Sequence, residues 1–323
     1  MLVLRGRDGV AKAAQMLLQG QCVALPTETV YGLAADARNE QAVARIFSAK
    51  GRPTNHPLIV HIPSAEHLDD WATDVPCAAR TLAAHCWPGP LTLLLKKSEH
   101  TSLVVTGGLD TVALRVPSHP LFLEVLARVA TGLAAPSANR YKALSPTTAD
   151  QVVSGLDGRI AAVLDGGPCE FGLESTIVDL TAEVPRIVRA GPISQAMLEE
   201  VLGRAVDAPT EHDAVVPGNV RAHYQPRTPL RKLMLSELAR EDLAPGAGGF
   251  IVYSSQVAAR LTAMGVAESA LCQLPENAAA YGKQFYAALH QMDQLGAKTL
   301  FVEEPPRGDD WSAVNDRLKR ALG

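Results

Sequence analysis

The sequence contains few cysteines and few aromatic residues. Its five cysteines are scattered over 323 residues without a C-x-x-C pair, so it predicts neither a zinc site nor a disulfide framework. Aromatic residues make up 5% and the formal net charge is −4, which argues against a strongly basic, stacking-rich surface for nucleic acids. No apolar run reaches the roughly 20 residues of a membrane helix. The N-terminus lacks a signal-peptide apolar core, and we expect a cytoplasmic protein with reduced thiols.

What the sequence does contain is an ordinary globular composition, with 47% hydrophobic and 20% charged residues. Its length favours two domains. Over the first 200 or so residues, segments with strand character alternate with segments of helical periodicity, for example 22–25 before 39–49. This alternation predicts an α/β domain, covering 1–206, with a substantial mixed sheet.

The alternation stops between Asp207 and Pro229, where prolines lie among polar residues, and it resumes afterwards. We interpret 207–229 as a linker and 230–323 as a small Rossmann-like domain. The glycines near position 248 precede their strand rather than follow it, so they do not form a dinucleotide-binding fingerprint. The linker holds more ring and cationic side chains than a passive tether needs, which favours a lid or a binding loop.

Short polar clusters follow or flank the predicted strands of the first domain. Lys50-Gly51-Arg52-Pro53 places two cations on a tight turn at the end of a helix, a pattern that suits a polyphosphate. The segment 26–32 supplies hydroxyl groups, and Arg115 ends an apolar strand. In α/β folds ligands bind at such strand ends.

Each cluster also has a purely structural interpretation. Ser137-Ala138-Asn139 could be a helix cap or a turn. Arg115 could form an ordinary ion pair, and His56 and His61 could be core or loop histidines. The clusters become informative through their joint order along the chain.

That order resembles the YrdC-like family. The first domain contains, in sequence, PTETVYGL, KGRP, PLIVHI, WPGPLTLLL, ALRVPSHP, APSAN and ESTIVDL, followed by an Arg-Ala-Gly element at Arg189. The segment His223-Tyr224-Gln225-Pro226 and the C-terminal AVNDRL resemble the two-domain members. The resemblance implies a YrdC-like twisted mixed sheet with flanking helices, plus a smaller Rossmann-like C-terminal domain.

The resemblance also implies an activity, that of an L-threonylcarbamoyladenylate synthase, a nucleotidyltransferase. Such an enzyme makes threonylcarbamoyl-AMP and pyrophosphate from L-threonine, bicarbonate or CO₂ and ATP, for the threonylcarbamoyladenosine modification of tRNA. Mg²⁺ would arrive on the ATP phosphates, with no metal site in the protein itself. The expected partner is a separate tRNA threonylcarbamoyl transferase complex, with no membrane and no stable nucleic-acid complex.

The family's site residues map onto this sequence motif by motif. The resemblance assigns catalysis to Lys50 and Arg52, and threonine to Thr29, His61, Arg115, Ala135 and Ser175. It assigns ATP to Lys50, Arg52, His56, Thr111, Ser137, Asn139, Ser145, Arg189, His223 and Tyr224. His56 stands where the family commonly has asparagine.

Two other functions compete with this prediction. The chain could be an RNA-binding module, or a related carbamoyl-transfer domain of a larger maturation enzyme. The composition argues against the first, and the missing C-x-x-C pairs argue against the zinc-finger segments expected with the second. The sequence leaves open whether residues 230–323 stabilise the protein, dock a partner or regulate the activity.

Overall fold

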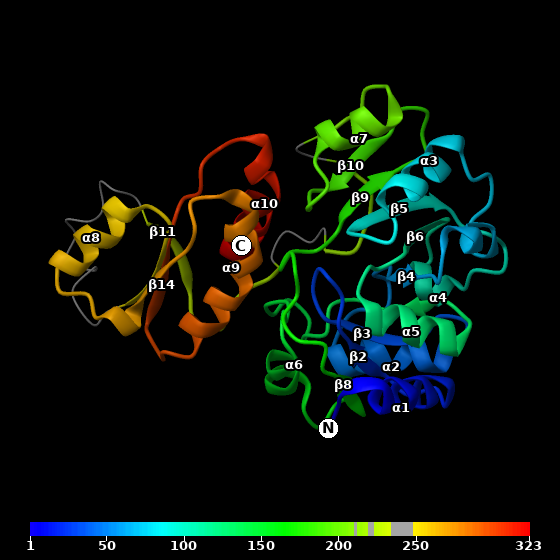
Figure 1. Ribbon diagram of the computed structural model, residues 1–323, viewed down its shortest axis with the longest axis horizontal. Helices are drawn as coiled ribbons and strands as arrows, with labels where there is room; N and C mark the ends of the chain where they lie inside the picture. Colours follow the sequence, from blue (N-terminus) through cyan, green and yellow to red (C-terminus); the bar gives the residue numbers. More distant parts are fainter. Residues whose placement is uncertain (210–211, 219–222, 234–247) are drawn as a thin grey trace. The chain divides into compact units, whose positions relative to one another are not determined.

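The computed structural model describes residues 1–209, 212–218, 223–233 and 248–323. The chain divides into two compact units, each with its own sheet (Figure 1). Unit 1 contains Met1–Tyr141, Ser145–Glu170 and Glu174–Asn219, and unit 2 contains Lys142–Leu144, Phe171–Leu173 and Val220–Gly323. The predicted linker 207–229 is thus divided between the two units, and its residues 210–211 and 219–222 lie outside the described ranges.

Unit 1 is built on a mixed sheet whose ten described strands follow the order β1-β8-β2-β3-β7-β4-β6-β5-β9-β10. The strands are β1 (Leu2–Leu4), β2 (Val23–Leu25), β3 (Gly32–Asp36), β4 (Ile59–His61), β5 (Leu91–Lys96), β6 (Thr111–Arg115), β7 (Leu133–Ala134), β8 (Ala162–Leu164), β9 (Thr176–Asp179) and β10 (Arg186–Arg189). Parallel pairs such as β4–β6 stand beside antiparallel pairs such as β5–β6.

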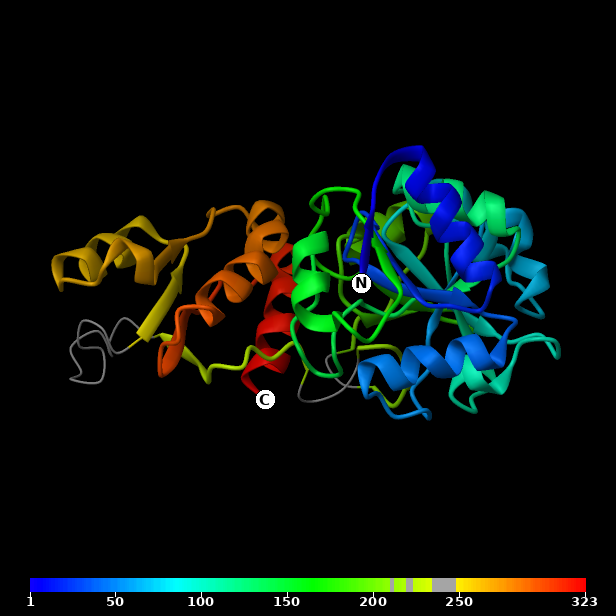
Figure 2. The same ribbon diagram turned by 90° about the horizontal axis from the view of Figure 1, so that it is seen from below.

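Helices cover both faces of this sheet. They are α1 (Gly6–Leu18), α2 (Glu40–Lys50), α3 (Cys77–Cys86), α4 (Leu103–Thr106), α5 (Pro120–Val129), α6 (Ala149–Leu156) and α7 (Gln195–Leu202), with the 3₁₀ turn η1 (Ala65–Asp70). Helices α1 and α5 share one apolar core, and α2 and α3 share the other. In Figure 2 α1 (dark blue) and α2 (lighter blue) lie on opposite sides of the strands.

Helix α2 forms where the sequence predicts it. The Asn39 side chain accepts a hydrogen bond from the backbone N–H of Ala42 and so caps its first turn. Gly51 ends the helix with φ = 64°, a left-handed conformation that glycine adopts without steric cost. The helix therefore delivers Lys50 and Arg52 around a tight turn.

Helices α1 and α5 pack on β2, β3, β7 and β8. A separate apolar cluster contains the buried residues Ile59 of β4, Ala113 of β6 and Ile177 of β9. The same cluster includes Val216 of the predicted linker, which is 4% exposed, and Ala214 packs against it. The first part of the linker is therefore packed onto the sheet of unit 1.

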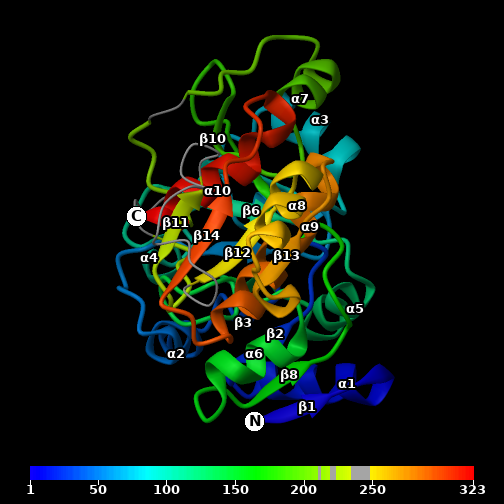
Figure 3. The same cartoon turned by 90° about the vertical axis from the view of Figure 1, so that its left-hand side faces the viewer.

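Unit 2 is a smaller α/β unit with a four-stranded parallel sheet in the order β11-β14-β12-β13 (Figure 3). Its elements are β11 (Leu230–Leu233), β12 (Gly248–Val252), α8 (Ser255–Ala263), η4 (Glu268–Ala270), β13 (Leu271–Gln273), α9 (Ala278–Asp293), β14 (Thr299–Glu303), η5 (Asp309–Trp311) and α10 (Ser312–Leu322). The predicted fold class, a large mixed sheet plus a smaller Rossmann-like unit, is confirmed. Among the described residues, no helix has the length and apolar character to span a bilayer.

Candidate active site

The face of the sheet on which α1 and α5 pack also carries predicted site residues, and the His61 ring lies 5.1 Å from the Phe122 ring of α5. His61 is paired in register with Arg115 of the neighbouring strand. Side chains two residues apart on a strand point to the same face, so both lie on the face that Ile59 and Ala113 share with Val216. The predicted site residues on β4 and β6 therefore meet on one surface.

Arg115 is 3% exposed and makes a buried ion pair that the sequence analysis did not foresee. Its Nη2 donates to Glu28 Oε1 at 2.5 Å, and its Nε donates to Gly89 O at 3.2 Å. The second Glu28 oxygen accepts from the backbone N–H of Ser118. The guanidinium is thus fixed from one side, and we call Arg115, Glu28 and His61 the arginine–glutamate end of the site.

Ser175 lies beside this end and is fully buried. Its Oγ is 2.7 Å from Thr92 Oγ1 and accepts from Arg189 Nη2 at 2.9 Å. Arg189 also donates through Nη1 to Pro217 O at 2.9 Å. An arginine predicted for ATP therefore lies next to a serine predicted for threonine, and it holds the linker as well.

The loop carrying Thr29 is organised by its neighbour Thr27. Thr27 Oγ1 lies 2.8 Å from Thr29 Oγ1, donates to Val30 O, and accepts from the backbone N–H groups of Thr29 and Val30. Both threonines are buried. This turn holds the Thr29 hydroxyl against Thr27 and also contains Glu28 of the arginine–glutamate end.

Lys50 is 3% exposed and binds the loop after β7. Its Nζ donates to Ser137 O at 2.5 Å, to Asn139 O at 2.6 Å and to Asn139 Oδ1 at 3.5 Å. Burial, with the nearby Arg52 cation, holds the pKa of the Lys50 ammonium well below its usual range. We call Lys50, Arg52, Ser137 and Asn139 the lysine end of the site.

Two further predicted residues, His56 and Ala135, lie near the start of β4, at the lysine end. Arg52 Nη2 donates to Pro57 O at 3.0 Å, and burial together with Arg52 lowers the pKa of His56. Ala135 lies beside this point, because its N–H donates to Ile59 O. Thr111 begins β6, so it lies about 13 Å along the strand from Arg115 and faces the same way.

Ser145 joins two loops of the site. Its Oγ donates to Glu174 Oε1 at 2.6 Å, and both residues are buried. Glu174 directly precedes Ser175. This bond therefore joins the segment after β7 to the loop that carries Ser175.

His61 is kept neutral by its surroundings. Burial, reinforced by the Arg115 and Arg189 cations, holds the pKa of its imidazole well below the ordinary 6.5. Its Nδ1 is buried without a hydrogen-bond partner among the described residues. A neutral imidazole with an unused nitrogen can donate to or accept from a polar ligand.

His223 and Tyr224 lie in unit 2, where they are 5% and 1% exposed. The backbone N–H of His223 donates to Arg320 O, and the Tyr224 ring lies beside Arg317 and Tyr286. Their contact with ATP stays a prediction.

The structure places thirteen of the predicted residues in unit 1 and leaves these two in the other unit. Sequence reasoning missed Glu28, Thr92 and Glu174 as parts of the site. Glu28 could have been noticed as an acid between two threonines, and Thr92 as a hydroxyl inside an apolar strand. No three potential metal-ligating side chains gather in the described residues.

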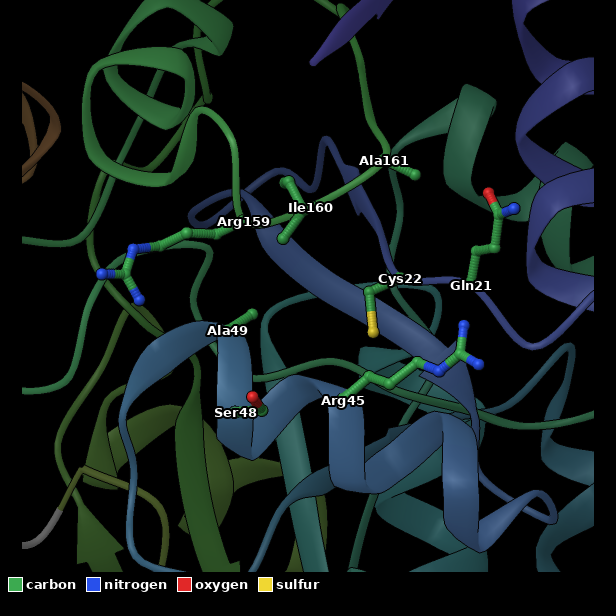
Figure 4. Close-up of a pocket in the computed structure, with 8 residues that line it drawn as sticks. All are labelled: Gln21, Cys22, Arg45, Ser48, Ala49, Arg159, Ile160 and Ala161. Carbon is green, nitrogen blue, oxygen red and sulfur yellow. The ribbon is translucent and has the colours of Figure 1, made fainter.

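A separate cavity of about 420 Å³ lies in unit 1 between α2 and the segment before β8. It is lined by Gln21, Cys22, Arg45 and Arg159, among others, and by none of the predicted site residues. The two arginine side chains point in different directions (Figure 4), so they do not converge on one anion.

Comparison with known proteins places the chain in a class and then in a family. Residues 15–191 match the family model described as telomere recombination, which covers Sua5, YciO and YrdC proteins. Residues 193–323 match the model described as threonylcarbamoyl-AMP synthase, C-terminal domain. The class is therefore that of two-domain YrdC-like proteins.

Comparison with individual relatives supports this class. The chain is 37% identical to a threonylcarbamoyl-AMP synthase of Pyrococcus abyssi over 96% of this chain and 93% of that protein. It is 44% identical to the Bacillus subtilis protein of the same name over 68% of this chain and 65% of that one. A crystal structure of P. abyssi Sua5 with L-threonine superposes with a TM-score of 0.83 at 33% identity, over 99% of this chain and 97% of that chain.

The chain belongs to the threonylcarbamoyl-AMP synthase family. These findings support the predicted synthase and not the RNA-binding module or the maturation domain.

Proposed function

We propose that this chain makes threonylcarbamoyl-AMP and pyrophosphate from L-threonine, bicarbonate or CO₂ and ATP. The observation that carries the proposal is that unit 1 buries a fixed arginine, Arg115, and a pair of cations, Lys50 and Arg52, at separate places among the predicted site residues. A zwitterionic amino acid and a polyphosphate require these two kinds of charge. The curated relatives named above carry the same activity in their names.

The arginine–glutamate end suits threonine. Glu28 accepts from Nη2 of Arg115 and Gly89 O accepts from its Nε, and both hold the guanidinium still, so that Nη1 can bind a carboxylate without reorientation. His61, which is paired in register with Arg115, and the Thr29 hydroxyl are proposed to bind the remaining polar groups of threonine. The name of the P. abyssi complex records L-threonine in a relative of this fold.

The lysine end suits the nucleotide. Lys50 orders the loop of Ser137 and Asn139, whose backbone and side chains would then line the phosphates or the ribose. Arg52 and Thr111 would contribute a cation and a hydroxyl from the neighbouring strands. Arg189, which reaches Ser175 and the linker, would bind where the two substrates meet.

The chemistry asks the protein mainly for positioning. The neutral threonine nitrogen bonds to the carbon of CO₂ and loses a proton, which gives a carbamate; with bicarbonate, a C–O bond of the bicarbonate also breaks, and its oxygen leaves as water with that proton. A carbamate oxygen then bonds to the α-phosphorus of ATP as the bond to the β-phosphate oxygen breaks and pyrophosphate leaves. When ATP arrives with Mg²⁺, the metal on its phosphates neutralises the charge of the leaving group. The cations of the chain hold both anions in line.

The linker acts as a lid in this proposal. Its first part already lies on the sheet of unit 1 through Val216 and through the bond of Arg189 to Pro217. A mixed anhydride is prone to hydrolysis, so a cover that excludes water serves the reaction. His223 and Tyr224 are proposed to reach the nucleotide when the lid closes.

The same proposal includes a cytoplasmic location and a separate partner complex that takes the product. The free cysteines fit a reducing cytoplasm. The product would be passed to a separate tRNA threonylcarbamoyl transferase complex, because an activated carbamoyl group is useful only to an acceptor.

The test is pyrophosphate release from ATP and Mg²⁺ by the purified chain, with and without threonine and bicarbonate, and with chromatography for the adenylate. Formation of threonylcarbamoyl-AMP only when all components are present is expected. If no adenylated product forms under these conditions, the proposal is wrong. Retention of tRNA without ATP, sensitive to salt, would instead favour an RNA-binding module.

A further inference from the structure

Unit 2 contains two short segments that come from the middle of the first domain's sequence. They are Lys142–Leu144 and Phe171–Leu173, and we call them the tethered segments. The residues before and after each one belong to unit 1. The chain therefore enters unit 2 twice, for three residues each time, before the predicted linker begins.

The first tethered segment is bound by a part of the predicted linker that belongs to unit 2. The backbone N–H of Gln225 donates to Lys142 O at 2.9 Å, and Ala143 forms a β-bridge with Gln225. Lys142 and Tyr224 have φ values of 67° and 60°, a left-handed conformation rare for such residues. Strain of this kind persists where the surrounding structure enforces it, and often at functional positions.

The second tethered segment is packed against helix α9. Gly172 has φ = 73°, and a Cβ atom there would lie only 2.3 Å from Lys283 O. Leu173 is 5% exposed and lies against Gly282, whose own Cβ would meet Leu173 Cδ1 at 3.0 Å. Two glycines thus allow the segment and the helix to approach closely.

Both tethered segments lead directly into the candidate active site. Ser145 follows Leu144, and Glu174 follows Leu173, and these two residues are joined by the 2.6 Å hydrogen bond between Ser145 Oγ and Glu174 Oε1. Ser175, which Arg189 and Thr92 bind, comes next. The positions of two predicted substrate-binding serines therefore depend covalently on unit 2.

We propose that unit 2 is a positioning element of the active site, acting through Gly172 and Leu173 on Ser175 and through the Gln225 bridge on Ser145. The inference rests on the proposed function and gives residues 230–323 a role in it. Gly172 and Leu173 are positioning residues, since they act through Glu174 and Ser175. A misplacement of reacting groups by about 1 Å can cost on the order of 100-fold in rate.

The first experiment is Gly172→Ala in the full chain, with Gly158→Ala as its control. Gly158 has nearly the same φ, 74°, but no described atom lies within 4 Å of its added Cβ. Both variants therefore introduce similar backbone strain, but only Gly172→Ala pushes the second tethered segment away from helix α9. We expect Gly172→Ala to raise the KM for threonine about tenfold or more, with a smaller change in the KM for ATP, and Gly158→Ala to leave both at wild-type values.

A second pair keeps the test decisive if Gly172→Ala does not fold. Gly282→Ala pushes on Leu173 from the other side while alanine favours helix α9. Gly155→Ala is its control, a glycine of helix α6 with no described atom within 4 Å of the added Cβ. A raised KM for threonine in Gly282→Ala alone, with an unchanged or higher Tm, supports positioning, because a merely structural glycine would not move KM in a stabilised protein.

Wild-type KM values in folded Gly172→Ala and Gly282→Ala would overturn the inference, as would equal KM changes in the control variants. If the wild-type chain itself makes no adenylate, the proposed function fails first, and the two failures are thereby distinguished.

Discussion

The two ends of the candidate site bury their cations in different ways. Arg115 is buried against a carboxylate, with Glu28 at 2.5 Å. Lys50 is buried against carbonyl and amide oxygens, and the pKa of its ammonium is held low. The charge of a buried cation that is paired with a carboxylate of the protein is already neutralised. Such a cation suits a ligand that needs a single oriented hydrogen bond from it. A cation held only by neutral acceptors gains most from a ligand that brings several negative charges.

The largest expected effect is at the arginine–glutamate end. Arg115→Ala should lose threonine binding, and it also leaves Glu28 buried without its ion-pair partner, at a cost of about 3–5 kcal/mol in stability or binding. Glu28→Gln keeps the shape but removes the charge, and we expect it to weaken threonine binding less. Calorimetric titration with threonine checks both, and unchanged affinity in Arg115→Ala would refute the assignment of this end.

At the lysine end, Lys50→Ala and Arg52→Ala should lose ATP and retain threonine. Removing one buried charged partner costs about 2–5 kcal/mol at an interface. Fluorescent-nucleotide binding and threonine calorimetry on the same preparations separate the two ligands. If both variants lost threonine and ATP to the same extent, the two ends would not be separate sites and the comparison above would fail.

Much of this arrangement could be predicted from the sequence. Helix α2 and the cationic turn after it follow from Asn39, the spacing of Ala42 and Ile46, and Gly51. The strands β4 and β6 follow from apolar runs that end in His61 and Arg115. These elements depend on local periodicity and capping, which the sequence carries explicitly.

Other features could not be predicted because they depend on pairings between distant residues. Strand β1 is exposed at the sheet edge and exists through its pairing with β8, 160 or so positions away. The ion pair of Glu28 with Arg115 and the bond of Arg189 to Ser175 join residues that no periodicity connects. The entry of 142–144 and 171–173 into unit 2 is also invisible in the sequence.

A moderate effect is expected where the linker lies on the sheet between the two ends. Val216→Asn should loosen the linker, because full burial of a valine side chain contributes about 1.5–3 kcal/mol. The neighbouring Val215 is 52% exposed, so Val215→Asn is the matched control. We expect faster hydrolysis of the adenylate and a higher KM for ATP in Val216→Asn only. Equal product lifetimes in the two variants would show that the linker is a tether and not a cover.

The smallest effect concerns the protonation of His61. Since the pKa of this buried imidazole is below its ordinary 6.5 in the folded protein, the unfolded chain binds the proton first as the pH falls. Folding stability should therefore decrease below about pH 6.5, with a slope of at most about 1.4 kcal/mol per pH unit from this one group. His61→Gln keeps a polar side chain without a titrating proton, so its stability should depend less on pH between 6.5 and 5.

Urea unfolding of the wild type and His61→Gln across this range measures the difference directly, since the other histidines titrate in both proteins. Threonine affinity, followed in parallel, should not change through His61 in this range, because the imidazole stays neutral in the folded protein. Identical pH dependence of stability in the two proteins would mean that His61 is not the neutral, buried partner of Arg115 that its geometry describes.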